Sequence, residues 1–219
     1  PTFVNMIRNK SMTSSILAPN SIIGIFGGGQ LGRMTCIAAH QLGYRTIIFS
    51  DTTNSPASQV TNKSIIANYD DEKALMKFAS QIDVATLEFE NIPVQAVKLV
   101  NKIKPVYPNA DILEITQNRL KEKDFLKQNN IAVTNYSKIT NLEELKFHLN
   151  NFNQALLKTS IMGYDGKGQY RLNQNSNLKE IWEENCKKEM ILEEWVDFKE
   201  EISVLTSRNL SGEIICYEP

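Results

Sequence analysis

The chain has 219 residues, of which 42% are hydrophobic and 22% charged, and its 24 Lys and Arg nearly balance 25 Asp and Glu, for a formal net charge of −1. This length is enough for one large or two modest globular domains. The near-zero net charge excludes the strongly positive overall electrostatic field that would bind a nucleic acid or an anionic membrane. No apolar run approaches the roughly 20 residues of a membrane span, and the amino-terminal segment lacks the apolar core of a signal peptide, so we expect a cytoplasmic protein without nucleic-acid or membrane partners.

The amino-terminal half alternates between strand and helix patterns. Residues 1–20 lack periodicity and are expected to form a loose leader. From residue 21 the predicted elements are strands at 22–26, 45–49, 64–67 and 84–89, with helices after the first strand and at 70–80. The first helix is indicated by apolar residues that recur at helical spacing, namely Leu31, Met34, Ala38 and Leu42. This order predicts an α/β, Rossmann-like domain over residues 21–118, with a parallel sheet covered by helices on both faces.

The carboxy-terminal half has a different pattern. A charged helix at 118–130 leads into it, and Thr140 with Glu143 form a plausible capping box for a helix that carries Leu142, Leu145 and Leu149. Further elements are predicted in the order strand 154–158, strand 169–172, helix 177–187, and strands 190–194, 201–207 and 213–217. The last two strands flank a turn at 209–212, so we expect an antiparallel α+β domain over residues 119–219.

Cysteines and histidines suggest no metal or redox chemistry. Cys36, Cys186 and Cys216 are far apart and never form a Cys-x-x-Cys pair, which disfavours a disulfide framework or a thiolate metal site. His40 and His148 each lack a second ligand four residues further along the chain. We expect no zinc site and no His-based catalytic triad.

The first glycine loop, Gly27–Gly32, matches G-x-G-x-x-G between a strand and a helix, and Asp51 ends the next strand. This is the pattern of a nicotinamide-dinucleotide site. Glycines at a helix N-terminus let the backbone approach any phosphate, whatever molecule carries it. The loop is also compatible with a tight turn alone, and Asp51 with a turn-forming role.

The second glycine loop is more informative. Lys158 ends an apolar strand, and the run GYDGKGQ follows at residues 163–169. Three glycines together with Lys167 can fold over a polyphosphate and exclude water during phosphoryl transfer. The alternative is a flexible hairpin with an ordinary surface lysine. Because no G-K-[ST] step begins a helix here, the loop is not a Walker A motif.

Acidic residues lie at the end of two predicted strands and at the start of a third. Glu193, Glu194, Trp195 and Val196 combine two carboxylates with an aromatic and an apolar side chain, as a nucleotide's ribose and adenine require, or they form a solvated strand end with Trp195 in the core. Strand alternation favours Glu201 over Glu200 as a cleft residue. Glu88 and Glu90 are expected in the crevice at the carboxyl ends of the parallel strands, or simply solvated there.

Four segments together resemble one family: GGGQLGRM (27–34), NRLKEK (118–123), LLKTSIMGYDGKGQ (156–169) and EEWVDFKEEISV (193–204). They closely resemble the N5-carboxyaminoimidazole ribonucleotide synthetases, ATP-grasp ligases of purine biosynthesis, and the likeness covers residues 22–218. The resemblance implies a pre-ATP-grasp domain followed by a partial ATP-grasp domain. It also implies that ATP, with Mg²⁺, converts bicarbonate to carboxyphosphate, whose carboxyl group passes to the amine of 5-aminoimidazole ribonucleotide and leaves ADP and phosphate.

The resemblance also implies roles for individual residues. Arg119 and Lys158 would contact the nucleotide phosphates, Glu193 to Val196 (Glu193, Glu194, Trp195 and Val196) the adenine, and Glu201 the ribose. The lid over the phosphates would be Gly163, Tyr164, Asp165, Gly166, Lys167, Gly168 and Gln169. Of these, Tyr164, Asp165 and Lys167 would reach substrate or bicarbonate as catalytic residues. The first loop would face the substrate ribonucleotide through Gly28, Gly29, Gln30 and Leu31, near Glu88 and Glu90.

Family members continue well beyond the last residue of this sequence, and the magnesium ligands lie in that further part. We therefore expect the 219-residue chain alone to be inactive or nearly so. A homodimer is expected from the resemblance. Two other hypotheses are an NAD-dependent oxidoreductase, which would rest on Gly27, Gly29, Gly32 and Asp51, and a nucleotide-binding module without turnover. The oxidoreductase lacks a plausible catalytic acid or base in its second domain.

Overall fold

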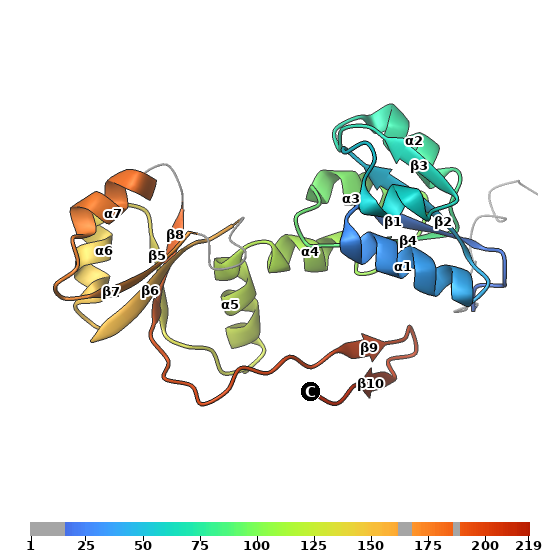
Figure 1. The fold of residues 1–219 in the computed structure, drawn as a ribbon. Helices are drawn as coiled ribbons and strands as arrows, with labels where there is room; N and C mark the ends of the chain where they lie inside the picture. The colour runs from blue at the N-terminus through green and yellow to red at the C-terminus, as the bar shows by residue number, and fades with distance from the viewer. Residues whose placement is uncertain (1–15, 162–167, 186–188) are drawn as a thin grey trace, which may run out of the picture. The chain divides into compact units, whose positions relative to one another are not determined.

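The computed structural model describes residues 16–161, 168–185 and 189–219 (Figure 1). Within these residues no helix has the length and apolar character needed to span a membrane. The chain divides into two compact units, one of residues 20–196 and one that contains residues 197–219. Of the predicted site residues, Gly163, Tyr164, Asp165, Gly166 and Lys167 lie outside the described residues, as does the leader up to residue 15.

The first sheet has four parallel strands in the order β3-β2-β1-β4. These are β1 (Ile22–Phe26), β2 (Arg45–Ser50), β3 (Lys63–Ile66) and β4 (Val84–Leu87). The surrounding helices are α1 (Gln30–Gln41), the 3-10 turn η2 (Pro56–Gln59), α2 (Glu72–Ala79), α3 (Val94–Asn101) and α4 (Ala110–Thr116). The parallel α/β architecture predicted from the strand–helix alternation is confirmed.

The strands alternate between two cores, one on each face of this sheet. Phe26 and Phe49 point to the larger core, where Phe78 of α2 contacts the Phe26 ring at a centroid distance of 5.2 Å. Ile25 and Ile48 point the opposite way, against α1 and η2. Helices therefore cover both faces (Figure 1), which keeps the carboxyl ends of the strands as the edge where polar groups gather.

The apolar residues that predicted α1 do not face the sheet. Leu31, Met34 and Leu42 are 57%, 56% and 71% exposed, and the buried residues of α1 are instead Gly32, Cys36 and Ala39. Both sets recur at helical spacing, so periodicity identified the helix but not its buried face. The small side chains face inward because they let the helix approach Ile25 and Ile48 closely.

The second sheet has four antiparallel strands in the order β5-β8-β6-β7. They are β5 (Tyr136–Ile139), β6 (Gln154–Thr159), β7 (Gln169–Asn173) and β8 (Met190–Glu194). On one face Leu157, Leu172 and Leu192 pack with α6 (Leu142–Leu149) and α7 (Leu178–Asn185). Because side chains alternate, Lys158 and Glu193 point to the opposite face, toward α5 (Arg119–Gln128) (Figure 1).

The cap of α6 is displaced by one residue from the predicted pair. Asn141, not Thr140, is the N-cap, and its side chain accepts a hydrogen bond from the Glu144 amide at 2.8 Å. The Glu144 carboxylate in turn accepts from the Thr140 amide at 2.7 Å. The prediction of a capped helix start is correct, but the N-cap is Asn141 rather than Thr140, and the carboxylate that reaches back to the Thr140 amide is that of Glu144 rather than Glu143.

Residues 197–219 carry one antiparallel hairpin, β9 (Thr206–Arg208) with β10 (Ile214–Cys216). The predicted hairpin is confirmed, but its first strand is shorter than expected. The ladder begins with the Tyr217 amide, which donates to the Leu205 carbonyl at 2.9 Å. Glu201 precedes the ladder in irregular chain, so the alternation argument that favoured it over Glu200 does not apply there.

Candidate functional site

A cavity of about 630 Å³ opens at the carboxyl ends of the parallel strands. Its walls are the first glycine loop, the residues that follow β2 and β4, and the turn before η2. Gly28, Gly29 and Glu88, predicted from sequence, all line it. Gln30, Leu31 and Glu90 are exposed and lie outside its lining. The sequence analysis missed Ser50, Ser55 and Tyr69, which also line the cavity and whose only signal was proximity to a strand end.

Glu88 fills the position that a phosphate would take in a dinucleotide site. Its Oε2 accepts a hydrogen bond from the Gly29 amide at 2.7 Å. A Cβ at Gly29 would lie 2.1 Å from Glu88 Oε1, and one at Gly27 would lie 2.3 Å from Oε2. Glycine is needed at Gly27, where φ is +110° and the Glu88 side chain lies against the backbone, whereas a side chain at Gly29 would require the Glu88 carboxylate to move. The negative charge at the N-terminus of α1 is thus supplied by the chain itself.

The cavity is acidic. Among the described residues that line it, Asp51 and Glu88 are charged and neither Lys nor Arg is present. Burial raises the pKa of Tyr69 strongly, and Asp51 and Glu88 raise it further by charge repulsion. Ser55 Oγ is buried beside Gly28 without a hydrogen-bond partner in the described structure. The arrangement suits a ligand that brings hydrogen-bond donors rather than an anion.

A second cluster lies on the face of the second sheet that points to α5. Lys158 Nζ lies 2.7 Å from Glu193 Oε2, and Lys123 Nζ lies 3.4 Å from Glu193 Oε1. These side chains are 19%, 8% and 16% exposed for Lys158, Glu193 and Lys123 respectively. Two ammonium groups against one carboxylate leave a net positive charge that is shielded from water, so it interacts strongly with an anion.

Arg119 adjoins this cluster at the start of α5. Its amide donates to the Ser160 carbonyl at 2.8 Å, and its Nη1 donates to the Thr159 carbonyl at 2.9 Å. Asn118 caps the helix by accepting from the Leu120 and Lys121 amides. The beginning of α5 is therefore attached to the end of β6, which carries Lys158. The predicted phosphate residues Arg119 and Lys158 thus come from adjoining elements, 39 positions apart in the chain.

The residues predicted to contact adenine differ in their partners and in how far they are buried. Glu194 accepts from Asn135 Nδ2 at 2.7 Å, and Trp195 is half-buried beneath the Arg171 guanidinium, whose carbon lies 4.0 Å from the ring centroid. Trp195 is thus not a core residue. Val196 is 50% exposed, and Glu201 belongs to the separate unit of residues 197–219.

Gly168 and Gln169, the described end of the second glycine loop, enter β7. Gly168 has φ of +69°, a backbone conformation that favours glycine. Its carbonyl accepts from the Thr159 amide at 3.2 Å, and Gln169 pairs with Lys158 across the strands. The loop therefore returns directly beside the lysine that precedes it.

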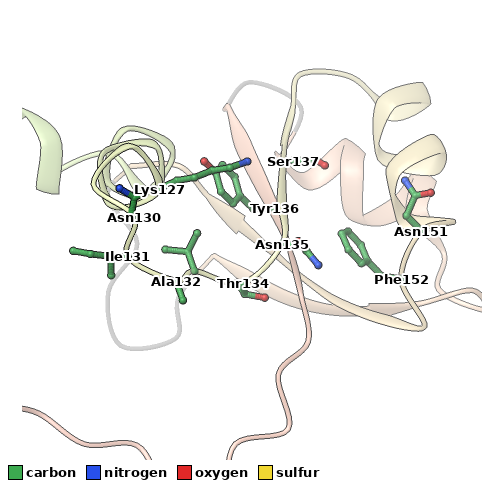
Figure 2. Close-up of a pocket in the computed structure, with 11 residues that line it drawn as sticks. Lys127, Asn130, Ile131, Ala132, Thr134, Asn135, Tyr136, Ser137, Asn151 and Phe152 are labelled. Carbon is green, nitrogen blue, oxygen red and sulfur yellow. The ribbon is translucent and has the colours of Figure 1, made fainter.

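A second cavity, larger than the one at the glycine loop, involves none of the predicted site residues. It has a volume of about 840 Å³ and lies between the end of α5, β5 and the end of α6. Figure 2 shows Lys127, Tyr136 and Phe152 among the side chains around it. Tyr136 donates a hydrogen bond to Asp124 Oδ1, which raises the pKa of Tyr136 to about 12. Size alone therefore does not select the site where the predicted residues meet.

Comparison with known proteins decides between the dinucleotide-binding and ATP-binding interpretations of the two glycine loops. A model described as the ribonucleotide synthetase preATP-grasp domain matches residues 21–117, and the ATP-grasp domain model matches residues 124–219. The N5-carboxyaminoimidazole ribonucleotide synthase of Brucella melitensis is 41% identical over 213 residues, with 94% of this chain and 58% of the relative covered. The chain carries a ribonucleotide synthetase preATP-grasp domain followed by an ATP-grasp domain.

Other synthetases of this kind agree. The Bacillus subtilis synthase is 37% identical, with 93% of this chain and 54% of the relative covered. A synthetase solved as its ADP complex superposes with a TM-score of 0.87 at 38% identity, covering 92% of this chain and 54% of that one. The chain thus spans about half the length of these synthetases. The predicted pre-ATP-grasp and ATP-grasp architecture is confirmed.

Proposed function

We propose that this chain supplies the ribonucleotide pocket and part of the ATP site of a ligase that carboxylates 5-aminoimidazole ribonucleotide with bicarbonate, with release of ADP and phosphate, in purine biosynthesis. The observation that carries the proposal is the chemical difference between two sites on the matched domains. One is an acidic cavity at the glycine loop, and the other is the cationic cluster around Glu193. We assign these to a pre-ATP-grasp domain over 21–118 and a partial ATP-grasp domain over 119–219.

The ATP phosphates belong beside Lys158 and Arg119 in this proposal. Lys158 is mostly buried and Arg119 adjoins the same strand end, so both cations lie where a polyphosphate would follow the second glycine loop. Charge-assisted contacts to phosphate are among the stronger polar interactions in proteins. The remaining proposed nucleotide contacts are Gly163, Tyr164, Asp165, Gly166, Lys167, Gly168, Gln169, Glu193, Glu194, Trp195, Val196 and Glu201. Tyr164, Asp165 and Lys167 also keep their proposed catalytic role toward substrate or bicarbonate.

The acidic cavity orients the ribonucleotide. Glu88 and Asp51 favour the amine and ribose hydroxyls, which donate hydrogen bonds, over a phosphate dianion. We therefore place the aminoimidazole and ribose toward Gly28, Gly29 and Glu88, with the phosphate directed away from Glu88. Gln30, Leu31 and Glu90 would contact the ribonucleotide only outside this cavity.

Mg²⁺ has no evident place among the residues that the structure describes. No group of three or more His, Cys, Asp or Glu side chains there could hold a metal ion. The described donor set does not fit the metal, and we derive no step through it. A homodimer and a cytoplasmic location remain further proposals, and light scattering tests the first of them.

The test is isothermal titration of the 219-residue chain with Mg·ATP, 5-aminoimidazole ribonucleotide and NAD⁺ in separate experiments. We expect the first two to bind and NAD⁺ not to bind, because a pyrophosphate at the N-terminus of α1 would have to displace Glu88. Binding of NAD⁺ with no binding of ATP would contradict the proposal. It would restore the oxidoreductase hypothesis.

A further inference from the structure

Glu193 is shared between two lysines from different elements. Lys158 reaches Oε2 from β6, and Lys123 reaches Oε1 from α5. We propose that Lys123 is a positioning residue for ATP: it neutralises Glu193 and so leaves the charge of Lys158 available to the nucleotide phosphates. This inference rests on the proposed function.

The two lysines differ in their distance from Glu193 and in their other contacts. Lys158 lies at hydrogen-bond distance from Glu193, 2.7 Å. Lys123 lies farther away, at 3.4 Å, and its ammonium also stands 5.7 Å from the Tyr136 ring centroid. Tyr136 is on β5, which pairs with β8 beside Glu193. Lys123 thus lies between α5 and the sheet, close to Glu193 and Tyr136. Lys158, in contrast, is on the strand that leads into the second glycine loop.

The charge balance gives Lys123 its importance. Lys158 and Glu193 alone would form a neutral ion pair, and such a pair attracts a polyphosphate weakly. With Lys123 the cluster carries one net positive charge, and water screens it poorly because all three side chains are less than 20% exposed. A phosphate can then interact with Lys158 without leaving the buried carboxylate unpaired, which would be costly.

Other lysines of α5 do not share this arrangement. Lys121 pairs with Glu114 at 3.0 Å and is 52% exposed, and Lys127 is exposed near the end of the helix. Lys123 follows Arg119 by four residues, one helical turn, so both lie on the same side of α5. Lys127 follows Lys123 by a further four residues but is exposed, so Lys123 is the lysine of α5 that pairs with Glu193.

The experiment compares ATP with adenosine in the wild-type chain and in Lys123→Met, Lys123→Arg and Lys127→Met. Lys123→Met should weaken ATP binding about tenfold, which is about 1.4 kcal/mol, and leave adenosine binding within about twofold, since adenosine has no phosphate to sense the charge. Lys123→Arg should restore most of the ATP affinity. Lys127→Met, the matched exchange on the same helix, should change neither ligand.

Three outcomes would overturn the inference, and a fourth would contradict the proposed function. Unchanged ATP affinity in Lys123→Met overturns the inference, and so does an equal loss of ATP and adenosine, which would mean that Lys123 only stabilises the fold. Failure of Lys123→Arg to recover ATP binding, with its denaturant midpoint unchanged, also overturns it. Failure of the wild-type chain to bind ATP contradicts the proposed function itself, so the two ideas are tested by different comparisons.

Discussion

The Gly29 amide donates a hydrogen bond of 2.7 Å to Glu88 Oε2, across 59 positions of sequence. The loop has the sequence pattern of a dinucleotide-binding site, but this contact places a carboxylate of the chain itself where a ligand phosphate would bind. The amide that would face a ligand phosphate is already satisfied by the carboxylate, and that carboxylate lines the cavity. The same glycines therefore line a cavity whose charged groups are the carboxylates of Asp51 and Glu88.

Gly29→Ala tests this relationship. The added Cβ would meet Glu88 Oε1 at 2.1 Å, so the carboxylate must move away from the Gly29 amide, and we expect a loss of about 0.5–1.5 kcal/mol of unfolding free energy with that hydrogen bond. Binding of 5-aminoimidazole ribonucleotide should weaken while binding of Mg·ATP is retained. Titration of both ligands measures this. An equal loss of both would show that the loop is structural only.

Lys158→Ala should weaken ATP binding, because it removes a charge-assisted contact worth roughly 1.5–3 kcal/mol. Lys138→Ala is the matched control, since Lys138 lies on the neighbouring part of the same sheet but is 56% exposed and pairs with Glu189. Titration calorimetry with Mg·ATP should separate the two variants. Equal ATP affinity in the wild-type chain and Lys158→Ala would remove Lys158 from the proposed site.

Glu114 gives a pH-dependent prediction for the first domain. Lys98 and Lys121 donate to its carboxylate and lower the pKa of Glu114 to about 2 from an ordinary value of 4.5. Because the folded-state pKa is the lower one, this stabilisation is complete above about pH 4.5 and is lost as the pH falls toward 2. Glu114→Gln should therefore be less stable at pH 7.

Urea unfolding at several pH values measures that effect. The difference between Glu114→Gln and the wild-type chain should close between about pH 4.5 and 2, and high salt should reduce it at pH 7 because these side chains are partly exposed. A difference that persists undiminished at pH 2 would assign the effect to packing rather than to charge.

Asn118 anchors the helix that carries Arg119 and Lys123. Its side chain accepts hydrogen bonds from two backbone amides of the first turn, those of Leu120 and Lys121. Asn118→Ala should lower the unfolding free energy by about 1 kcal/mol, whereas Asn118→Ser should retain most of it. Denaturant unfolding of both variants checks this. An equal loss in the two variants would mean that the cap is not the cause.

Local patterns accounted for the elements whose signal lies within themselves. Strands β1, β2, β6 and β8 were predicted nearly at their bounds, because apolar runs beside glycines or carboxylates mark buried strands. The sequence analysis missed α3, α4 and β5. β5 is short and mixed in polarity, and it is a strand because it pairs with β8, more than 50 positions away.

The sequence by itself determined the order of the two domains, the two glycine loops and the family resemblance, since these depend on residue types at fixed spacings. Only the tertiary structure decided which face of α1 is buried, that Glu88 occupies the first glycine loop, and that Lys123 shares Glu193 with Lys158. The physical reason is that each of these features depends on how side chains from distant segments pack together or pair their charges. The spacing of residues within one segment does not determine such contacts.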